Sequence, residues 1–288
     1  MGKCLMGKIL DGKSLANLRA QKLKKEIEIL KQDGIKPLFC VINIGDDPAS
    51  KVYVKTKKRR AQEMGIEQKI YQLPSTESEE SVLNLIDELN QDPSVHGIMV
   101  QMPTPEQIDV NHLLERIDPE KDVDGLTPTN IGHLWQSDHF VEPATAIGIM
   151  KLLEHYKINV AGKNVAIIGR SNIVGKPLAA LMLEKDASVS VLHSKTKSLS
   201  TYTRMADIII VAAGQANLLT SEMVEKGAVV IDVGINRVEG HLVGDVDFKQ
   251  VLSKASWITP VPGGVGPLTV ELLMEQVVKL TRRAHGIK

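Results

Sequence analysis

The sequence is poor in cysteine and aromatic residues, carries no net charge and has no long apolar run. Its two cysteines are Cys4 and Cys40, and it has no Cys-x-x-Cys or His-Glu-x-x-His motif, so we expect reduced thiols, no disulfide framework and no metal site. Lys and Arg total 35, as do Asp and Glu, so no overall field attracts nucleic acid or an anionic membrane. No apolar run approaches the roughly 18 residues that span a bilayer. The first residues lack a secretion or myristoylation signal, and we predict a cytoplasmic enzyme or binding protein.

Short apolar runs alternate with amphipathic stretches along the 288 residues. The apolar runs are typical of buried strands, at 38–44, 97–102, 165–168, 189–192, 208–213 and 229–233. Helix patterns are found at 15–31, 48–64, 79–90, 178–183, 221–226 and 270–283. This alternation predicts an α/β fold with mostly parallel sheets, and the length suggests two domains. We expect a first domain of residues 1–141 plus 270–288 and a second, Rossmann-like domain of residues 142–269.

Residues 262–269 hold three glycines and two prolines, a composition that predicts a loop. The loop follows an apolar run at 255–259 and precedes the last helix pattern. It therefore lies at the carboxyl end of an expected strand, where open α/β sheets bind ligands. A plain strand-to-helix connection is the alternative.

A second glycine-containing turn follows the strand expected at 165–168. Gly169 permits a tight turn, Gly175 allows close backbone approach, and Pro177 suits a first helical turn. This arrangement is typical of phosphate binding at a helix N-terminus, although the spacing differs from Gly-x-Gly-x-x-Gly. A structural turn without a ligand is the alternative.

The next strand indicates which dinucleotide this turn would bind. An NAD-binding protein would carry Asp or Glu at its end, whereas this strand ends in His193-Ser194-Lys195. With Arg170 in the glycine turn, the ribose corner suits a 2′-phosphate, which predicts NADP. Solvated surface charges are the alternative.

The helix expected at 48–64 is rich in cations, with Tyr53 and Lys57 four residues apart on one face. Like charges and burial would both lower the pKa of Lys57 toward values useful in proton transfer. A solvated charge or a nucleic-acid patch is the alternative, and the short run in a neutral chain argues against the patch.

Three further polar residues, at a strand end and in an acidic loop, are candidates for ligand binding. Gln101 ends the strand expected at 97–102, where an amide contacts either a ligand or a neighbouring loop. Asp122 and Asp124 share an acidic loop, where they could bind a cation, hold the amino edge of a heterocycle or cap a turn.

Five ordered motifs, at 45–57, 95–101, 121–125, 169–177 and 260–267, resemble those of the bifunctional methylenetetrahydrofolate dehydrogenase/methenyltetrahydrofolate cyclohydrolase family. The resemblance covers essentially the full length. It implies two α/β domains flanking a cleft, NADP as cofactor, tetrahydrofolate derivatives as substrates and a homodimer, with no nucleic acid or membrane partner. The implied reactions are oxidation of methylenetetrahydrofolate and hydrolysis of the methenyl product to formyltetrahydrofolate.

The resemblance also implies roles for individual residues. Lys57 matches the catalytic lysine and Gln101 its amide partner, while Tyr53 and Asp124 match positions that line the folate cleft and anchor the pterin. The matched substrate-binding loop contains Gly263, Gly264 and Pro267. The matched cofactor-binding positions are Gly169, Arg170, Ser171, Ile173, Gly175, Ser194 and Ile235.

The chain departs from the family pattern at two places. Pro143-Ala144-Thr145-Ala146 stands where the family has Pro-Cys-Thr-Pro, and the missing second proline loosens a pre-set turn. Met102 and Thr104 replace more apolar residues after Gln101, which would change the polarity of the pocket.

Two rival functions are another NADP-dependent dehydrogenase with a Rossmann-like domain and a non-catalytic NADP-binding or nucleic-acid-binding module.

Overall fold

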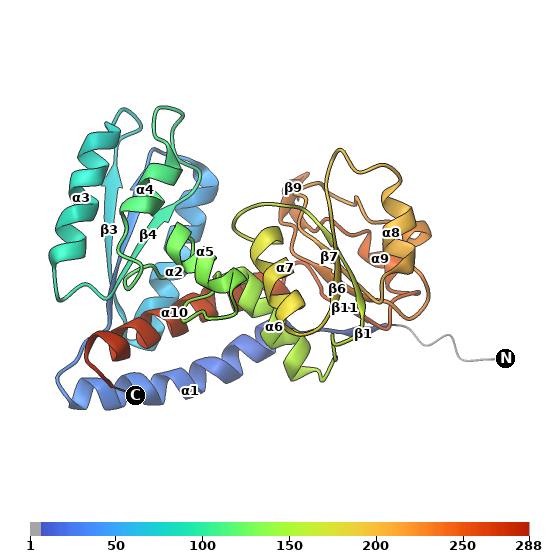
Figure 1. Cartoon of the computed structure of the whole chain (residues 1–288), viewed down its shortest axis with the longest axis horizontal. Coiled ribbons are helices and arrows are strands. Elements are labelled where there is room, and N and C mark those ends of the chain that lie inside the picture. Colours follow the sequence, from blue (N-terminus) through green and yellow to red (C-terminus); the bar gives the residue numbers. More distant parts are fainter. Residues whose placement is uncertain (1–6, 288) are drawn as a thin grey trace. The chain divides into compact units, whose positions relative to one another are not determined.

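The computed structural model describes residues 7–287, which form two compact units of α/β structure (Figure 1). The first unit contains the described residues up to Asn17 together with Thr145–Thr269, and the second contains Leu18–Ala144 and the described residues from Val270 onward. Two helices, α1 (Gly12–Gln32) and α10 (Val265–Ala284), continue from one unit into the other. The prediction of an α/β fold with mostly parallel sheets and a Rossmann-like domain is confirmed.

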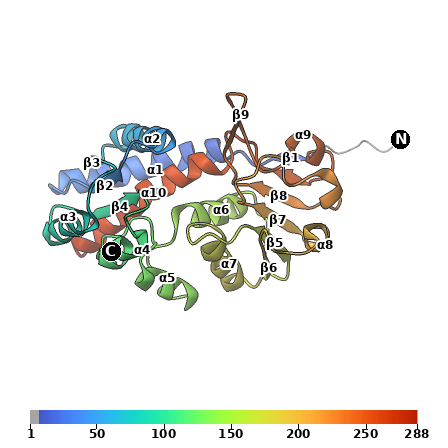
Figure 2. The same ribbon diagram turned by 90° about the horizontal axis from the view of Figure 1, so that it is seen from above.

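The first unit is built on a six-stranded parallel sheet with the order β1-β11-β8-β7-β5-β6 (Figure 2). Its strands are β1 (Lys8–Ile9), β5 (Asn164–Ile168), β6 (Ser188–Leu192), β7 (Ile208–Val211), β8 (Val229–Asp232) and β11 (Trp257–Ile258). Its helices are α6 (Ala144–His155), α7 (Gly175–Glu184), α8 (Leu199–Met205), α9 (Phe248–Val251) and the 3₁₀ turn η1 (Ser221–Met223). A hairpin of β9 (Asn236–Val238) and β10 (His241–Val243) follows β8.

The second unit is built on a three-stranded parallel sheet with the order β3-β2-β4. Its strands are β2 (Leu38–Ile44), β3 (Glu67–Leu73) and β4 (Gly97–Gln101). Its remaining helices are α2 (Pro48–Met64), α3 (Glu79–Gln91), α4 (Val110–Arg116) and α5 (Pro128–Trp135). Apolar side chains of β2 and β4 pack against those of α3 and α4 in one core, which holds the carboxyl ends of both strands in place.

Three details differ from the expectations. The helix expected at 221–226 is only the 3₁₀ turn η1. The apolar residues that suggested a helix face, among them the buried Val224, pack into the core of the first unit. The helix expected to begin at 270 begins at Val265, because Pro267 lies in the first turn, where a missing N–H costs no helical hydrogen bond. Residues 7–17 were expected with the first domain, but β1 pairs with β11 in the six-stranded sheet.

The structure also shows the outcome at the missing proline and at one of the two cysteines. Helix α6 begins at Ala144 although the second proline is missing, and Ala146 is buried in its first turn. Cys40 is a free, buried cysteine within β2, whereas Cys4 lies outside the described residues.

Candidate active site

Helix α2 presents Tyr53 and Lys57, and its two ends are fixed by local contacts. The carboxylate of Asp47 accepts a hydrogen bond of 2.7 Å from the amide of Ser50, which caps the N-terminus. The helix ends at Gly65, whose φ of 81° places it in the left-handed region that favours glycine. Tyr53 and Lys57 therefore lie one turn apart on a helix of defined register.

The Lys57 ammonium contacts the end of strand β4. Its Nζ donates a hydrogen bond of 3.0 Å to Oε1 of Gln101 and lies 3.7 Å from Sδ of Met99. The Gln101 amide nitrogen donates to the carbonyl of Met102 at 2.8 Å, which orients the amide oxygen toward the lysine. Gln101 is buried, so this amide contact is shielded from bulk water.

Burial shifts the pKa values of Lys57 and of Asp124. It lowers the pKa of the Lys57 ammonium, and the nearby carboxylate of Asp124 opposes that change. Burial raises the pKa of the Asp124 carboxyl to about 6, with Lys57 acting in the opposite direction and Asp122 adding to the rise. The expectation that burial lowers the pKa of Lys57 is confirmed, whereas the charge that acts on this pKa comes from Asp124 and not from the neighbouring cations.

Asp122 has a structural role in the same acidic loop. Its carboxylate accepts hydrogen bonds from the Thr127 amide at 2.8 Å and from the Asn130 side chain at 2.9 Å. These contacts cap the loop that leads into α5. Of the roles considered for the acidic loop, Asp122 therefore has that of capping a turn. Within residues 7–287, no group of three His, Cys, Asp or Glu side chains is arranged to hold a metal ion.

In the first unit, the turn between β5 and α7 is too tight for any residue but glycine at two positions. Gly169 has a φ of 128°, and a Cβ there would lie 2.2 Å from the carbonyl oxygen of Ala212. A Cβ on Gly175 would lie 2.1 Å from the carbonyl oxygen of Gly169. The hydroxyl of Ser171 accepts from the amide of Val174 at 3.2 Å, which closes the turn. The exposed turn leads into the N-terminus of α7 and so fits a dinucleotide phosphate.

Arg170 and Ser194 follow neighbouring strands at the same level. The register pairs Ile168 of β5 with Leu192 of β6, and each exposed residue lies two positions further along. Ile173, also predicted to bind the cofactor, is 43% exposed in the adjoining turn. The structure therefore places these three side chains at one edge of the sheet.

The remaining predicted residues line one small pocket of about 100 Å³ in the first unit. Ile235, Gly263, Gly264 and Pro267 all contribute to its wall. Gly264 must be glycine, because a Cβ would lie 2.7 Å from the carbonyl oxygen of Pro260. The wall also contains Asp232, which ends β8 and was not among the predicted site residues, although a strand was predicted at 229–233.

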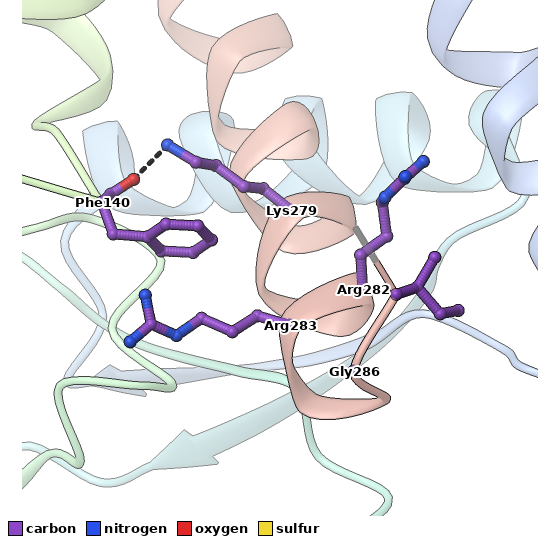
Figure 3. Close-up of a pocket in the computed structure, with 6 residues that line it drawn as sticks. Phe140, Lys279, Arg282, Arg283 and Gly286 are labelled. Carbon is purple, nitrogen blue, oxygen red and sulfur yellow. Dashed lines mark hydrogen bonds between the residues drawn. The ribbon is translucent and has the colours of Figure 1, made fainter.

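A larger hollow in the second unit has a different character (Figure 3). Lys279 and Arg283 of α10 lie on either side of the Phe140 ring, with the charged groups 4.4 and 4.3 Å from its centroid. Lys279 also donates to the Phe140 carbonyl, and Arg283 pairs with Glu120. The contacts hold the segment around Phe140 against α10.

Comparison with known proteins identifies the family. Residues 10–124 match the catalytic domain of tetrahydrofolate dehydrogenase/cyclohydrolase, and residues 143–285 match its NAD(P)-binding domain. The chain belongs to the tetrahydrofolate dehydrogenase/cyclohydrolase family.

Individual members of this family are similar over nearly the whole chain. The bifunctional protein FolD of Lactobacillus delbrueckii subsp. bulgaricus is 66% identical, covering 98% of this chain and 100% of its own. The bifunctional FolD from Campylobacter jejuni is 50% identical with a TM-score of 0.95, covering 96% of this chain and 99% of its own. The Trypanosoma brucei enzyme, solved with NADP and an inhibitor, is 35% identical with a TM-score of 0.93, covering 97% of this chain and 99% of its own.

Family membership confirms the predicted bifunctional enzyme, a dehydrogenase and cyclohydrolase of tetrahydrofolate derivatives with an NAD(P)-binding domain. The two rival functions are therefore set aside. Among the described residues, no helix is long and apolar enough to cross a membrane.

Proposed function

We propose that this chain oxidises 5,10-methylenetetrahydrofolate to 5,10-methenyltetrahydrofolate with NADP and hydrolyses that product to 10-formyltetrahydrofolate. Folate binding is assigned to the second unit and NADP binding to the first. The observation that carries the chemical assignment is the hydrogen bond of 3.0 Å from Lys57 to Gln101, in the family's catalytic domain.

Lys57 and Gln101 are assigned the proton transfers of hydrolysis. Water adds to the amidinium carbon of the methenyl group, the bond from that carbon to N5 breaks, and N5 receives a proton while a second proton leaves to solvent. A lysine whose pKa burial lowers can accept a proton from the attacking water and return one to N5. Gln101 holds the amine in place in either protonation state, because its oriented amide oxygen accepts a hydrogen bond from both forms.

Asp124 and Tyr53 are assigned to the pterin. An ionised Asp124 accepts hydrogen bonds from paired N–H groups on the heterocycle edge, which are strong because one partner is charged. The Tyr53 ring is 40% exposed one turn from Lys57 and offers an aromatic face for a planar ring. These two residues orient the substrate so that its one-carbon bridge meets the amine.

The first unit is assigned the cofactor. When bound, NADP accepts the hydride from the methylene carbon. Gly169, Ser171 and Gly175 form the turn that would receive its phosphates, and Arg170 and Ser194 are placed to bind the 2′-phosphate. Ile173 and the pocket lined by Ile235, Gly263, Gly264 and Pro267 are assigned contacts with the remaining groups of the ligands.

Purified protein tests both activities. Methenyltetrahydrofolate absorbs where methylenetetrahydrofolate does not, so its formation with NADP and its decay without NADP report the two steps separately. Absence of both activities in a folded protein would contradict the proposal. Turnover of a carbocyclic hydroxy acid in its place would favour the rival dehydrogenase, and salt-dependent DNA retention without folate turnover would favour the binding module.

We also propose a cytoplasmic homodimer without a nucleic-acid or membrane partner. The homodimer is supported by the family resemblance, and the location by the neutral overall charge and the composition. Light scattering coupled to size-exclusion chromatography would give twice the chain mass of 31.5 kDa. A mass of 31.5 kDa at assay concentration would contradict the dimer.

A further inference from the structure

Two carboxylates, Asp232 and Asp245, are buried together at the carboxyl edge of the six-stranded sheet, 3% and 0% exposed. Within residues 7–287, neither carboxylate accepts a hydrogen bond from a cationic side chain, and backbone amides supply most of their donors. Two neighbouring buried charges are costly in a protein interior. A pair of carboxylates buried at such a cost is expected where the pair holds the backbone of a functional site in place.

Asp232 ties the end of β8 to the segment after β10. Its Oδ1 accepts from the amides of Gly234 at 3.0 Å and Asp245 at 2.9 Å, and its Oδ2 accepts from the amide of Val246 at 3.0 Å. The backbone amide of Asp232 in turn donates to the hydroxyl of Thr259 at 2.7 Å. Because Thr259 directly precedes the loop that begins at Pro260, Asp232 joins the segments on two sides of the small pocket.

Asp245 ties the same cluster to the end of β7. Its Oδ2 accepts from the amides of Ala213 at 2.7 Å and Gly214 at 2.9 Å, and its Oδ1 accepts from the Asn236 side chain at 2.8 Å. The fit is close: a Cβ on Gly234 would lie 2.1 Å from Oδ1 of Asp245. Asp245 therefore fixes both the turn after β7 and the segment that carries Ile235.

The turn after β7 abuts the dinucleotide turn. The amide of Ala212 donates to the carbonyl of Ile168 at 2.7 Å, and Ala212 leaves no room for a side chain on Gly169. A shift of Asp245 would therefore be transmitted through Ala213 to the glycine turn and through Asn236 to Ile235. One side chain thus supports the turn next to the proposed phosphate site and the segment that carries Ile235.

We propose that Asp245, supported by Asp232, is a positioning residue for the dinucleotide, setting the conformation of the Ala213–Gly214 turn and of the segment around Ile235. This inference rests on the proposed function, because it needs NADP to bind the first unit. Asp245 itself needs no contact with the cofactor.

The test is NADP binding by calorimetry to the full-length Asp245→Ala variant, with Asp247→Asn as the matched control. Asp247 caps α9 by accepting from the Gln250 amide, and Asn caps equally well, so the control should bind like the unmodified protein. Removing an acceptor of three hydrogen bonds should raise the dissociation constant about tenfold or more. Asp245→Asn should restore most of the affinity, because its oxygen still accepts from Ala213 and Gly214 while the Asn236 amide flips to accept from its nitrogen.

Two measurements separate positioning from general loss of structure. Hydrogen exchange should speed up at the amides of Ala213 and Gly214 in folded Asp245→Ala. Decay of methenyltetrahydrofolate without NADP should stay within about twofold, because Lys57 and Gln101, which are assigned its proton transfers, belong to the second unit. A folded Asp245→Ala variant that binds NADP as tightly as the unmodified protein would overturn the inference.

If Asp245→Ala does not fold, Asn236→Ala takes its place. This variant removes one donor to Asp245 and should weaken NADP binding about threefold, and an unchanged dissociation constant would overturn the inference. Failure of the unmodified protein to bind NADP would instead contradict the proposed function.

Discussion

The ammonium of Lys57 donates a hydrogen bond of 3.0 Å to the side-chain oxygen of Gln101, whose own amide nitrogen is held by the Met102 carbonyl. The lysine therefore reaches the end of strand β4 with its position fixed by a neutral group. A carboxylate in place of Gln101 would favour the charged amine and oppose the effect of burial. The neutral partner leaves the amine able to change its protonation state during a reaction.

Replacing Lys57 with Met should abolish hydrolysis of methenyltetrahydrofolate. The substitution keeps much of the side-chain length and removes the proton-carrying group, so the rate should fall by roughly 10²-fold or more. The measurement is the decay of added methenyltetrahydrofolate, corrected for its uncatalysed hydrolysis. Lys58→Met, an exposed neighbour on the same helix, is the control and should keep its activity. Decay at the unmodified rate in Lys57→Met would remove Lys57 from the mechanism.

Folate turnover should depend on pH through Asp124. Burial raises the pKa of this carboxyl from its ordinary 3.8 to about 6. The proposed contact with the pterin needs the ionised form, so kcat/KM for the folate should fall as pH drops through 6. Asp124→Asn should show low activity in both reactions without this dependence. NADP affinity should not change, whereas its collapse would assign the loop to the cofactor.

The same carboxyl affects stability with a defined sign. The folded protein keeps the Asp124 proton to a higher pH than the unfolded chain, so this group's contribution to the free energy of unfolding falls as pH rises from about 4 to 6. Urea unfolding at several pH values should show a smaller decrease in Asp124→Asn than in the unmodified protein. Asp138→Asn, whose side chain is 86% exposed, should leave the slope unchanged.

Arg170→Ala should weaken NADP binding while leaving NAD nearly unaffected. Loss of a charge-assisted phosphate contact costs on the order of 1.5–3 kcal/mol, which is roughly a 10-fold to 100-fold change. The measurement is kcat/KM for each cofactor. Lys185→Ala removes an exposed cation at the other end of α7 and is the control. Equal efficiency of the unmodified enzyme with NADP and NAD would contradict the assigned 2′-phosphate site.

The ion pair between Arg60 and Glu271 should matter far more for stability than its exposed neighbour. Arg60 donates to the fully buried carboxylate of Glu271 at 2.6 Å, and the other carboxylate oxygen has no hydrogen-bond partner among the described residues. Arg60→Ala leaves a buried charge uncompensated and should lower the free energy of unfolding by about 3 kcal/mol. The side chain of Arg59 is 75% exposed and lies 3.7 Å from Glu63. Replacing Arg59 with Ala should lower the free energy of unfolding by less than about 0.5 kcal/mol. Urea unfolding gives both values, and equal losses would show that the buried pair has no special weight.

Sequence patterns were sufficient to predict a helix or strand where the apolar residues of the pattern are the ones buried in the structure. The apolar runs at 38–44 and 229–233 became β2 and β8 because both are buried. Strand β3 was missed because its residues Glu67–Leu73 are partly exposed and only two of them are aliphatic. The helix expected at 221–226 failed because its apolar spacing reflects packing into a core rather than a helix face.

In the candidate site, too, the residues placed by local geometry were predictable, whereas those brought together from distant positions were not. Tyr53 and Lys57 are neighbours through helix geometry alone, and Gln101 is placed by the end of a strand, so both were predictable. The pairing of Asp232 with Asp245 joins residues 13 apart, and Asp245 reaches Ala213 32 positions away. No local pattern reveals which acid in such a stretch is buried, because that depends on how three strand ends meet.

Helices α1 and α10 each pass from one compact unit to the other, so neither unit is a single stretch of chain. The second unit receives from α10 the buried side chains of Leu272, Leu273, Met274 and Val277, which are synthesised only after Thr145–Thr269 of the first unit. During synthesis, the part of the second unit that bears Lys57 is therefore complete up to Ala144 long before α10 is available to cover its apolar surface. A single proteolytic cut therefore cannot release either unit intact.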